Sequence, residues 1–193
     1  MESYDLPTSV SVGGAEREIR SDYRAALDVM RVLSDPELSD GERAFVALSI
    51  FYVDADGIAR RDMDEAVSRM YWFLGGGEEP SRDRRKKPRL MDWDQDFPLI
   101  VGPVNRVLGM EVRSVPYDRE ANAGGLHWWT FLGAYREIGD CMFAQVVSIR
   151  KKRAMGQKLD KADKQFYEGN RELVDLRRKA TEAETALLAE WIT

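Results

Sequence analysis

The 193-residue chain has only one cysteine and one histidine, and these scarcities remove several classes of function. Cys141 has no second cysteine to pair with, so an internal disulfide is excluded. A zinc site takes three or four ligands, and here it would have to rely on carboxylates because HExxH and CxxC motifs are both missing. We therefore expect no metal, no cofactor and no disulfide framework.

Long apolar runs and a signal segment are also missing. The longest apolar stretches fall far short of the roughly 20 residues that a membrane-spanning helix needs. The N-terminal MESYDLPTSV has neither the basic region nor the apolar core of a signal peptide. With 44% hydrophobic residues, 33% charged residues and a net charge of −5, the composition fits a folded protein of a reducing cytoplasm. We expect no membrane partner, and the mild acidity argues against nucleic acid as the main partner.

What the sequence does contain is helical periodicity after a short β pattern. Val10, Val12 and Ile19 are apolar positions around Gly13-Gly14, a pair typical of a hairpin turn. Beyond them, apolar residues recur at helical spacing behind capping residues. The sequence predicts a mainly α fold with six or seven helices, a small N-terminal β-hairpin and a long C-terminal helix. The expected helices begin near Asp22, Ser39, Asp62, Asp92, Leu126, Asp140 and Lys161. Glu42 lies three residues after Ser39, as in a capping box, and a loop is expected over residues 113–124.

The composition divides the chain into four stretches. Residues 1–74 hold the hairpin and the first helices. Residues 75–91 combine glycine, proline and charge with almost no apolar content, which is typical of a flexible charged linker or loop. Residues 92–158 are predicted to supply core helices that complete the same helical domain, with Gly102-Pro103 kinking or splitting the first of them. Residues 159–193 are predicted to form the long C-terminal helix.

The stretch GGLHWWTFLGAY, residues 124–135, contains the single histidine and raises the question of catalysis. A catalytic histidine needs a nucleophile or a carboxylate partner; GxSxG is absent, although a Ser-His-Asp triad stays open on sequence alone. The alternative is structural, because Gly124-Gly125 can turn the chain into a helix that is apolar around most of its girth. We favour the structural interpretation and predict a fold-signature core of His127, Trp128, Trp129 and Phe131.

Two charged stretches have competing explanations. The acidic residues of 92–96 have the spacing of the first positions of a calcium loop, but Phe97 and Pro103 occupy the places of its glycine and final glutamate. Helix capping explains this set better. The basic run of residues 82–89 has no interleaved aromatic residue for base stacking. A solvated loop explains it better than contact with phosphate or an acidic partner, so nucleic acid is a disfavoured partner.

The strongest interaction signal lies in the expected C-terminal helix. Its apolar positions alternate steps of three and four, the heptad rhythm of a coiled-coil seam, although Gly169 and Glu190 are poor seam residues. This seam could pack on the protein's own core, or it could bind a partner helix or a second copy of the chain. The partner-binding hypothesis names Phe166, Leu173, Leu176, Ala180, Ala183 and Leu187.

Four stretches, taken in order, resemble a known family. They are DLPTSVSVGG with Ile19 and DYR at 22–24, then DWDQD at 92–96, LHWWxF at 126–131 and Ile149-Arg150. Their order is similar to that of the bacteriophage family called gene product fifteen, over residues 5–151, and LHWWxF is the most specific part. The resemblance implies a small, largely helical protein, encoded near tail genes in phage or prophage genomes.

The resemblance also implies a function. A tail assembly chaperone would shield the long apolar helix of the tape-measure protein in the host bacterial cytoplasm, before the tail tube polymerises. The implied partners are the tape-measure protein and other tail proteins. A structural component of the phage particle, such as a connector or tail completion protein, is the alternative, and a nucleic-acid-binding regulator is a third. The family motif carries no catalytic residue to transfer, so we expect no enzyme.

Overall fold

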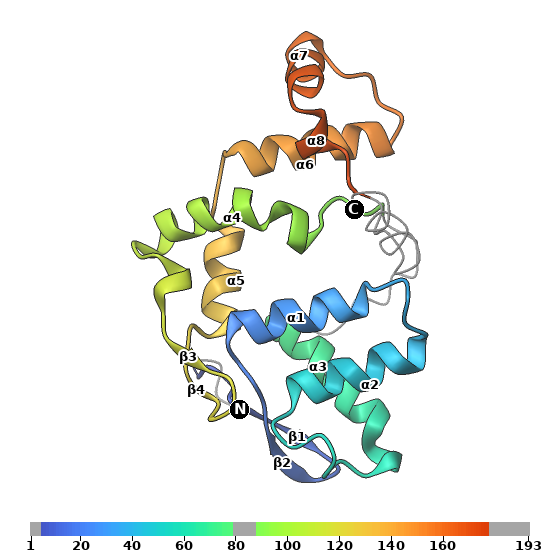
Figure 1. Ribbon diagram of the computed structural model, residues 1–193, viewed down its shortest axis with the longest axis vertical. Helices are drawn as coiled ribbons and strands as arrows, with labels where there is room; N and C mark the ends of the chain where they lie inside the picture. The colour runs from blue at the N-terminus through green and yellow to red at the C-terminus, as the bar shows by residue number, and fades with distance from the viewer. Residues whose placement is uncertain (1–4, 79–87, 178–193) are drawn as a thin grey trace, which may run out of the picture. The chain divides into compact units, whose positions relative to one another are not determined.

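The structure is a computed structural model that describes residues 5–78 and 88–177 (Figure 1). Within these residues the fold is mainly helical, with eight α-helices and a small N-terminal β-hairpin, which confirms the predicted fold class. The described chain forms two compact units. Unit 1 contains residues 5–78 and 117–128, and unit 2 contains residues 88–116 and 129–177.

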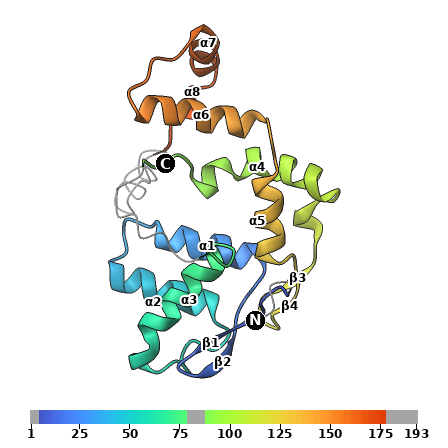
Figure 2. The ribbon, with the colours of Figure 1, turned by 180° about the vertical axis from the view of Figure 1, so that it is seen from behind.

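Unit 1 begins with the predicted hairpin, β1 (Ser9–Val12) and β2 (Ala15–Glu18) (Figure 2). The strands are antiparallel, and their register places Ser9 opposite Glu18. Gly13-Gly14 form the turn with φ values of 60° and 76°, the left-handed conformation that a two-residue hairpin turn of this kind requires. The two valines of β1 are buried, so this strand presents its apolar face to the core.

Three α-helices follow: α1 (Tyr23–Leu33), α2 (Asp40–Phe51) and α3 (Met63–Leu74), the last preceded by the 3-10 turn η1 (Arg60–Asp62). Helix α1 lies beside α2, and α3 packs against α2 and β1 (Figures 1 and 2). Ser39 and Glu42 form the predicted capping box of α2. Asp62 occupies the predicted cap position of α3, but its side chain makes no capping hydrogen bond.

Aromatic side chains fill the centre of unit 1. The ring of Phe51 lies 4.8 Å from that of Tyr52 and 5.3 Å from that of Phe73. The buried Tyr52 hydroxyl donates to the Ala66 carbonyl oxygen at 3.0 Å, so its polar atom is satisfied inside the core. Ile19, just after β2, pairs with Tyr52 through an isolated β-bridge and joins the hairpin to the end of α2.

Unit 2 is built from helices: α4 (Trp93–Leu108), the 3-10 turn η2 (Val112–Ser114), α5 (Trp128–Arg136) from its second residue, α6 (Met142–Ala154), α7 (Lys161–Gly169) and α8 (Arg171–Val174). Helix α6 packs against α4 and α8, and α8 also contacts α7. The N-cap of α6 is Cys141, not the predicted Asp140, and it makes no side-chain capping bond. The core of this unit includes Ile100, Val104, Phe131, Phe143, Val146 and Ile149.

Helix α4 runs without interruption through Gly102-Pro103, so the predicted split does not occur. A proline inside a helix removes one hydrogen-bond donor and costs about 3 kcal/mol. Ile100, Val101 and Val104 are buried on the same stretch of the helix. Their burial offsets the local preference for a break, and tertiary packing decides the outcome.

The predicted C-terminal helix is not continuous over residues 161–177. Helix α7 ends at Gly169, Asn170 leaves the helical conformation with φ of −137°, and α8 is only four residues long. The Asn170 side chain donates to the Phe166 carbonyl oxygen at 2.9 Å, in the place of a main-chain N–H of the next turn. Glycine and asparagine are weak helix formers, and this side-chain bond ends α7. Residues 178–193 lie outside the described residues.

The predicted loop at 113–124 contains a second small hairpin, formed by β3 (Tyr117–Asp118) and β4 (Ala123–Gly124). Tyr117 is opposite Gly124 in its register. Asn122, in the turn, adopts a left-handed φ of 49° and donates to the Ile19 carbonyl oxygen at 3.1 Å. The hairpin therefore belongs to unit 1, and it leads the chain back to the start of α1.

Candidate partner-binding site

Residues 125–128, which we name the strap, lie antiparallel to the start of α1. The Trp128 N–H donates to the Ser21 carbonyl oxygen at 2.7 Å, and the Tyr23 N–H donates to the Leu126 carbonyl oxygen at 2.9 Å. Asp22 and His127 are the paired residues between these two bonds. The single histidine is therefore part of a two-strand contact between segments about one hundred residues apart in the chain.

One buried carboxylate joins the strap to α1. Asp22 is 3% exposed, and it accepts from the Arg24 N–H at 2.9 Å and from the Leu126 N–H at 2.8 Å. Burial raises the pKa of Asp22, while these two N–H donors and the nearby cations Arg24 and Arg119 offset part of that effect. Gly125 has a φ of 88°, and a Cβ at this position would collide with the Asp22 carboxylate. Glycine is thus required where the strap passes the carboxylate.

The imidazole of His127 holds the N-terminal segment. Its Nε2 donates to the Pro7 carbonyl oxygen at 2.9 Å, since a carbonyl can only accept, and its ring lies edge-on to Phe73 at 5.6 Å. Burial lowers the pKa of His127, and the Pro7 carbonyl and the Asp22 charge counteract this only in part. A neutral histidine bonded to a main-chain carbonyl fits the structural role predicted from the sequence.

The predicted fold-signature residues divide by burial. Trp128 is 1% exposed, and its indole N–H donates to the Leu74 carbonyl oxygen at 3.0 Å at the end of α3. Phe131 is fully buried in unit 2, where its ring lies 6.4 Å from that of Trp93. His127 and Trp129 are half-buried. Trp128 and Phe131 are therefore the two core members of the set, one in each unit.

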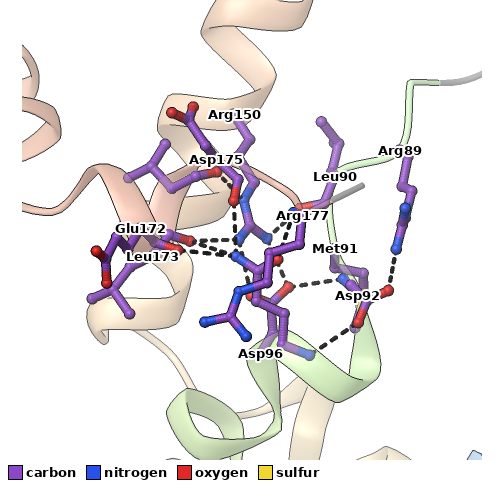
Figure 3. Close-up of polar contacts among 12 residues, drawn as sticks. Arg89, Leu90, Met91, Asp92, Asp96, Arg150, Glu172, Leu173, Asp175 and Arg177 are labelled. Atoms are coloured by element: carbon purple, nitrogen blue, oxygen red, sulfur yellow. Dashed lines mark hydrogen bonds and ion pairs between the residues drawn. The ribbon is translucent and has the colours of Figure 1, made fainter. Parts of the chain in front are cut away.

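Unit 2 contains a buried ion pair that the sequence did not predict. Arg150 of α6 donates to both oxygens of Asp96 in α4, at 2.7 and 2.9 Å (Figure 3). Its remaining N–H groups donate to the carbonyl oxygens of Leu90 at 3.0 Å, Leu173 at 2.6 Å and Val174 at 2.7 Å. All five donors of the guanidinium are used, which is the condition under which a buried arginine is tolerated.

Gln95 extends this network to the chain that follows α8. Its amide nitrogen donates to the carbonyl oxygens of Glu172 at 3.2 Å and Asp175 at 2.9 Å, and its amide oxygen accepts from the Arg177 N–H at 2.9 Å. Arg150 and Gln95 together bind five main-chain groups between residues 172 and 177. The network therefore fixes the position from which the C-terminal residues leave unit 2.

From the sequence, Asp96 is interpreted as a helix-capping charge, and Arg150 enters through the family resemblance. Asp96 does lie in the first turn of α4, where it accepts from the Asp92 N–H at 2.8 Å, and Asp92 is the N-cap. Asp96 and Arg150 also belong to two separate stretches, DWDQD and Ile149-Arg150, that carried the family resemblance. Their joint presence was the signal from which the pair could have been inferred.

The predicted partner-binding residues are only partly within the described chain. Phe166 and Leu173 pack against a buried cluster of Val146, Ile149 and Val174 in unit 2. Leu176 is half-buried. The other three predicted residues, Ala180, Ala183 and Leu187, lie outside the described residues. Over its described part, the heptad pattern thus supplies contacts to the core of unit 2.

The charged stretches have structural uses where the structure describes them. Asp92 caps α4 and pairs with Arg89, and Asp96 binds Arg150. Within residues 5–78 and 88–177, no three side chains of His, Cys, Asp or Glu are grouped to hold a metal ion. In the same residues, none of the helices combines the length and apolar character needed to span a membrane. Most of the basic run, residues 82–87, lies outside the described residues.

Several large apolar side chains remain exposed in the described chain. Those of unit 1 are Leu6, Phe45 and Tyr71, and those of unit 2 are Val107, Met110, Met142 and Met155. Three of the four in unit 2 are methionines, whose flexible and polarisable side chains adapt to different partners. Exposed apolar groups of this kind can form a protein–protein contact.

A family model described as Bacteriophage Gp15 protein matches residues 3–98. The matched range includes the N-terminal hairpin, Asp22 and the acidic start of α4, whereas the strap and Arg150 lie beyond it. No curated protein and no solved structure matches the chain. The match, over about half of the chain, supports the assignment of this protein to the bacteriophage Gp15 family, which is not a known enzyme family.

Proposed function

We propose that this protein is a non-enzymatic tail assembly chaperone of a phage or prophage, which binds the tape-measure protein during tail morphogenesis. The family match supports a bacteriophage protein. The observation that carries the proposal is how the chain uses its polar groups. His127, Asp22, Asp96 and Arg150 are all bonded to the chain's own backbone or to each other.

Apolar contact is the interaction that the proposed role requires. A chaperone for a long amphipathic helix must cover the apolar stripe of that helix and then release it when the tube polymerises. Exposed side chains such as Phe45, Met110, Met142 and Met155 can bury apolar surface without a fixed lock-and-key geometry. Helix-in-groove or helix-on-helix recognition through such groups is reversible, and the proposed role requires a reversible contact.

The C-terminal seam remains part of the proposal. Leu173 serves the core of unit 2, so Leu173→Asp should destabilise the fold by inserting a charge beside that cluster. Leu176→Asp should leave the fold intact and weaken tape-measure binding if the seam contacts the partner. Thermal melting and co-purification separate these two effects. Binding by a folded Leu176→Asp variant at the wild-type level would remove Leu176 from the binding surface.

The experiment for the function is co-expression with the tape-measure protein of the same phage. The expected result is a soluble complex, whereas the tape-measure protein expressed with an unrelated acidic helical protein should aggregate. Mass spectrometry of purified particles is the second arm. A chaperone should be absent from the particle or far below stoichiometric amounts, and a stoichiometric copy number would identify a structural component instead. Failure to form any complex would reject the proposal.

A further inference from the structure

Helix α2 buries one side and leaves the other open. Ala47, Leu48 and Phe51 face the core, where α1 and α3 pack against the helix. Phe45 projects from the opposite side and is 65% exposed, the highest value among the exposed large apolar residues of the described chain. A phenylalanine left in water to this extent forgoes most of the free energy that its burial would provide.

The residues one turn before and after Phe45 are small. Gly41 and Ser49 lie at i−4 and i+4, on the same outward stripe of α2. The space above Gly41 is open, and the Ser49 hydroxyl is bonded to the Phe45 carbonyl oxygen at 3.0 Å, so it lies down against its own helix. Phe45 is therefore a single protruding side chain, or knob, between two small residues of the helix surface. A partner helix can approach such a surface closely and accept the ring between its own side chains.

The segment that leads into Phe45 carries mainly negative charge. Residues 34–46 contain four carboxylates, Asp35, Glu37, Asp40 and Glu42, and one cation, Arg43. Arg43 is paired with Asp40. Hydrogen bonds from Ser39 lower the pKa of Glu42, which therefore stays ionised at neutral pH. The open face of α2 thus combines an aromatic knob with an acidic border at the N-terminal half of the helix.

We infer that the Phe45 face of α2, with Gly41 and Ser49 as its floor, docks an amphipathic helix that carries lysine or arginine beside its apolar stripe. The inference rests on the proposed function, which makes a segment of the tape-measure protein the source of this helix. A second copy of the chain is a poorer occupant, because two acidic borders would face each other in a symmetric contact.

The test uses 25-residue peptides that tile the tape-measure protein of the same phage, with binding to the full chain followed by fluorescence anisotropy. Phe45→Ser should weaken the binding of a basic amphipathic peptide by about tenfold or more, as expected of an aromatic anchor. Tyr71→Ser is the matched control, since Tyr71 is an aromatic residue of the same unit that is 44% exposed on α3. Its binding should stay within about twofold of the wild type.

Glu42→Gln tests the acidic border, and glutamine keeps the capping box of α2 intact. This variant should bind more weakly than the wild type at low salt and show less dependence on salt. A peptide that binds Phe45→Ser and the wild type equally would overturn the inference while leaving the chaperone function standing. Equal loss in Phe45→Ser and Tyr71→Ser would also overturn it.

A second probe keeps the inference testable if the co-expressed tape-measure protein forms no complex with this chain, the result that would reject the proposed function. The probe is a designed helix with a leucine and alanine stripe and lysine flanks, compared with a twin whose flanks are glutamate. A preference for the lysine helix that disappears in Phe45→Ser would support the docking face without the tape-measure protein. No preference between the twins would overturn the inference as well.

Discussion

His127 gives unit 1 a pH dependence that one substitution can isolate, because the chain has no other histidine. Burial lowers its pKa, so on acidification the unfolded chain binds a proton near pH 6.5 before the folded chain does. The stability contribution is complete above about pH 7.5, and it is lost as the pH falls from about 6.5 through the lowered pKa of the folded chain. His127→Gln retains a neutral donor for the Pro7 carbonyl and removes this titration.

Urea unfolding at about pH 7.5 and pH 5.5 measures the effect. The midpoint of the wild type should fall more between the two pH values than that of His127→Gln. Burial raises the pKa of Asp22, so this residue makes the folded protein less stable as the pH rises above 3.8. Asp22 is present in both proteins, and its effect cancels in the comparison. Equal pH sensitivity of the two proteins would show that His127 has no part in it.

Replacement of Gly125 and of Gly133 by alanine should have opposite effects on stability. Gly125→Ala places a Cβ against the Asp22 carboxylate at a left-handed φ, so it should cost at least about 1–3 kcal/mol. Gly133 lies within α5 with open space around it, and Gly133→Ala should stabilise by about 0.5–1 kcal/mol through helix propensity. Thermal melting of the two variants checks the signs. A Gly125→Ala variant as stable as the wild type would mean that the strap does not pass as close to the Asp22 carboxylate as the structure shows.

Arg150 and Arg153, three residues apart on α6, contrast a buried and an exposed ion pair. Arg150→Met leaves Asp96 charged and buried and removes one donor from each of three carbonyls, so it should cost about 3–5 kcal/mol. Arg153 pairs with Asp175 at the surface, and Arg153→Met should cost less than about 1 kcal/mol. Chemical denaturation measures both values, and similar costs would contradict the structure.

At the scale of elements, local signals located most helices. Ser39 with Glu42 and Gly13-Gly14 predicted a capping box and a hairpin turn, because these features depend on residues only a few positions apart. The strap was not predictable, since its partner Asp22 is about one hundred residues away and nothing in either segment specifies the other. The sequence therefore indicated a structural His127 without indicating the bonds that make it so.

The C-terminal region shows why a heptad rhythm was insufficient. Two short helices, with a break at Asn170, satisfy the spacing of Phe166 and Leu173 as well as one long helix would. Periodicity records which residues share an apolar face, but it does not record whether the surface they contact is a partner or the same chain. The sequence therefore predicted which residues of the candidate site are apolar, but it did not predict which surface they contact.

Helix α7 predicts a local effect of one substitution. Phe166→Ala removes the ring that packs against the cluster of Val146, Ile149 and Val174, and it should cost about 1–3 kcal/mol at this half-buried position. Hydrogen exchange should accelerate in α7 and α8 while α1 to α3 keep their protection. Met155→Ala is the control, because Met155 is exposed. It should change neither the stability nor the exchange rates of α7 and α8. Uniform acceleration across the chain would contradict a local role.

At the scale of the whole molecule, unit 1 is not one continuous stretch of sequence. A fragment of residues 1–78 lacks Trp128 and the Leu126 N–H that binds the buried Asp22 carboxylate. This fragment should unfold without a cooperative transition. A variant in which a flexible linker joins residue 78 to residues 117–128 should regain cooperativity, as measured by near-ultraviolet circular dichroism. A cooperative transition in the fragment without the strap would contradict this prediction.

The late position of the strap also has a consequence for biosynthesis. The ribosome releases the hairpin and α1 to α3 well before it synthesises residues 125–128, so the carboxylate of Asp22 first emerges without its Leu126 donor. At 5–20 residues per second, the 50 residues between positions 78 and 128 take roughly 3 to 10 s. During this interval the place of Trp128 at the end of α3 is empty. The nascent chain is then open to general chaperones and proteases, and slow codons between positions 78 and 128 should reduce its yield.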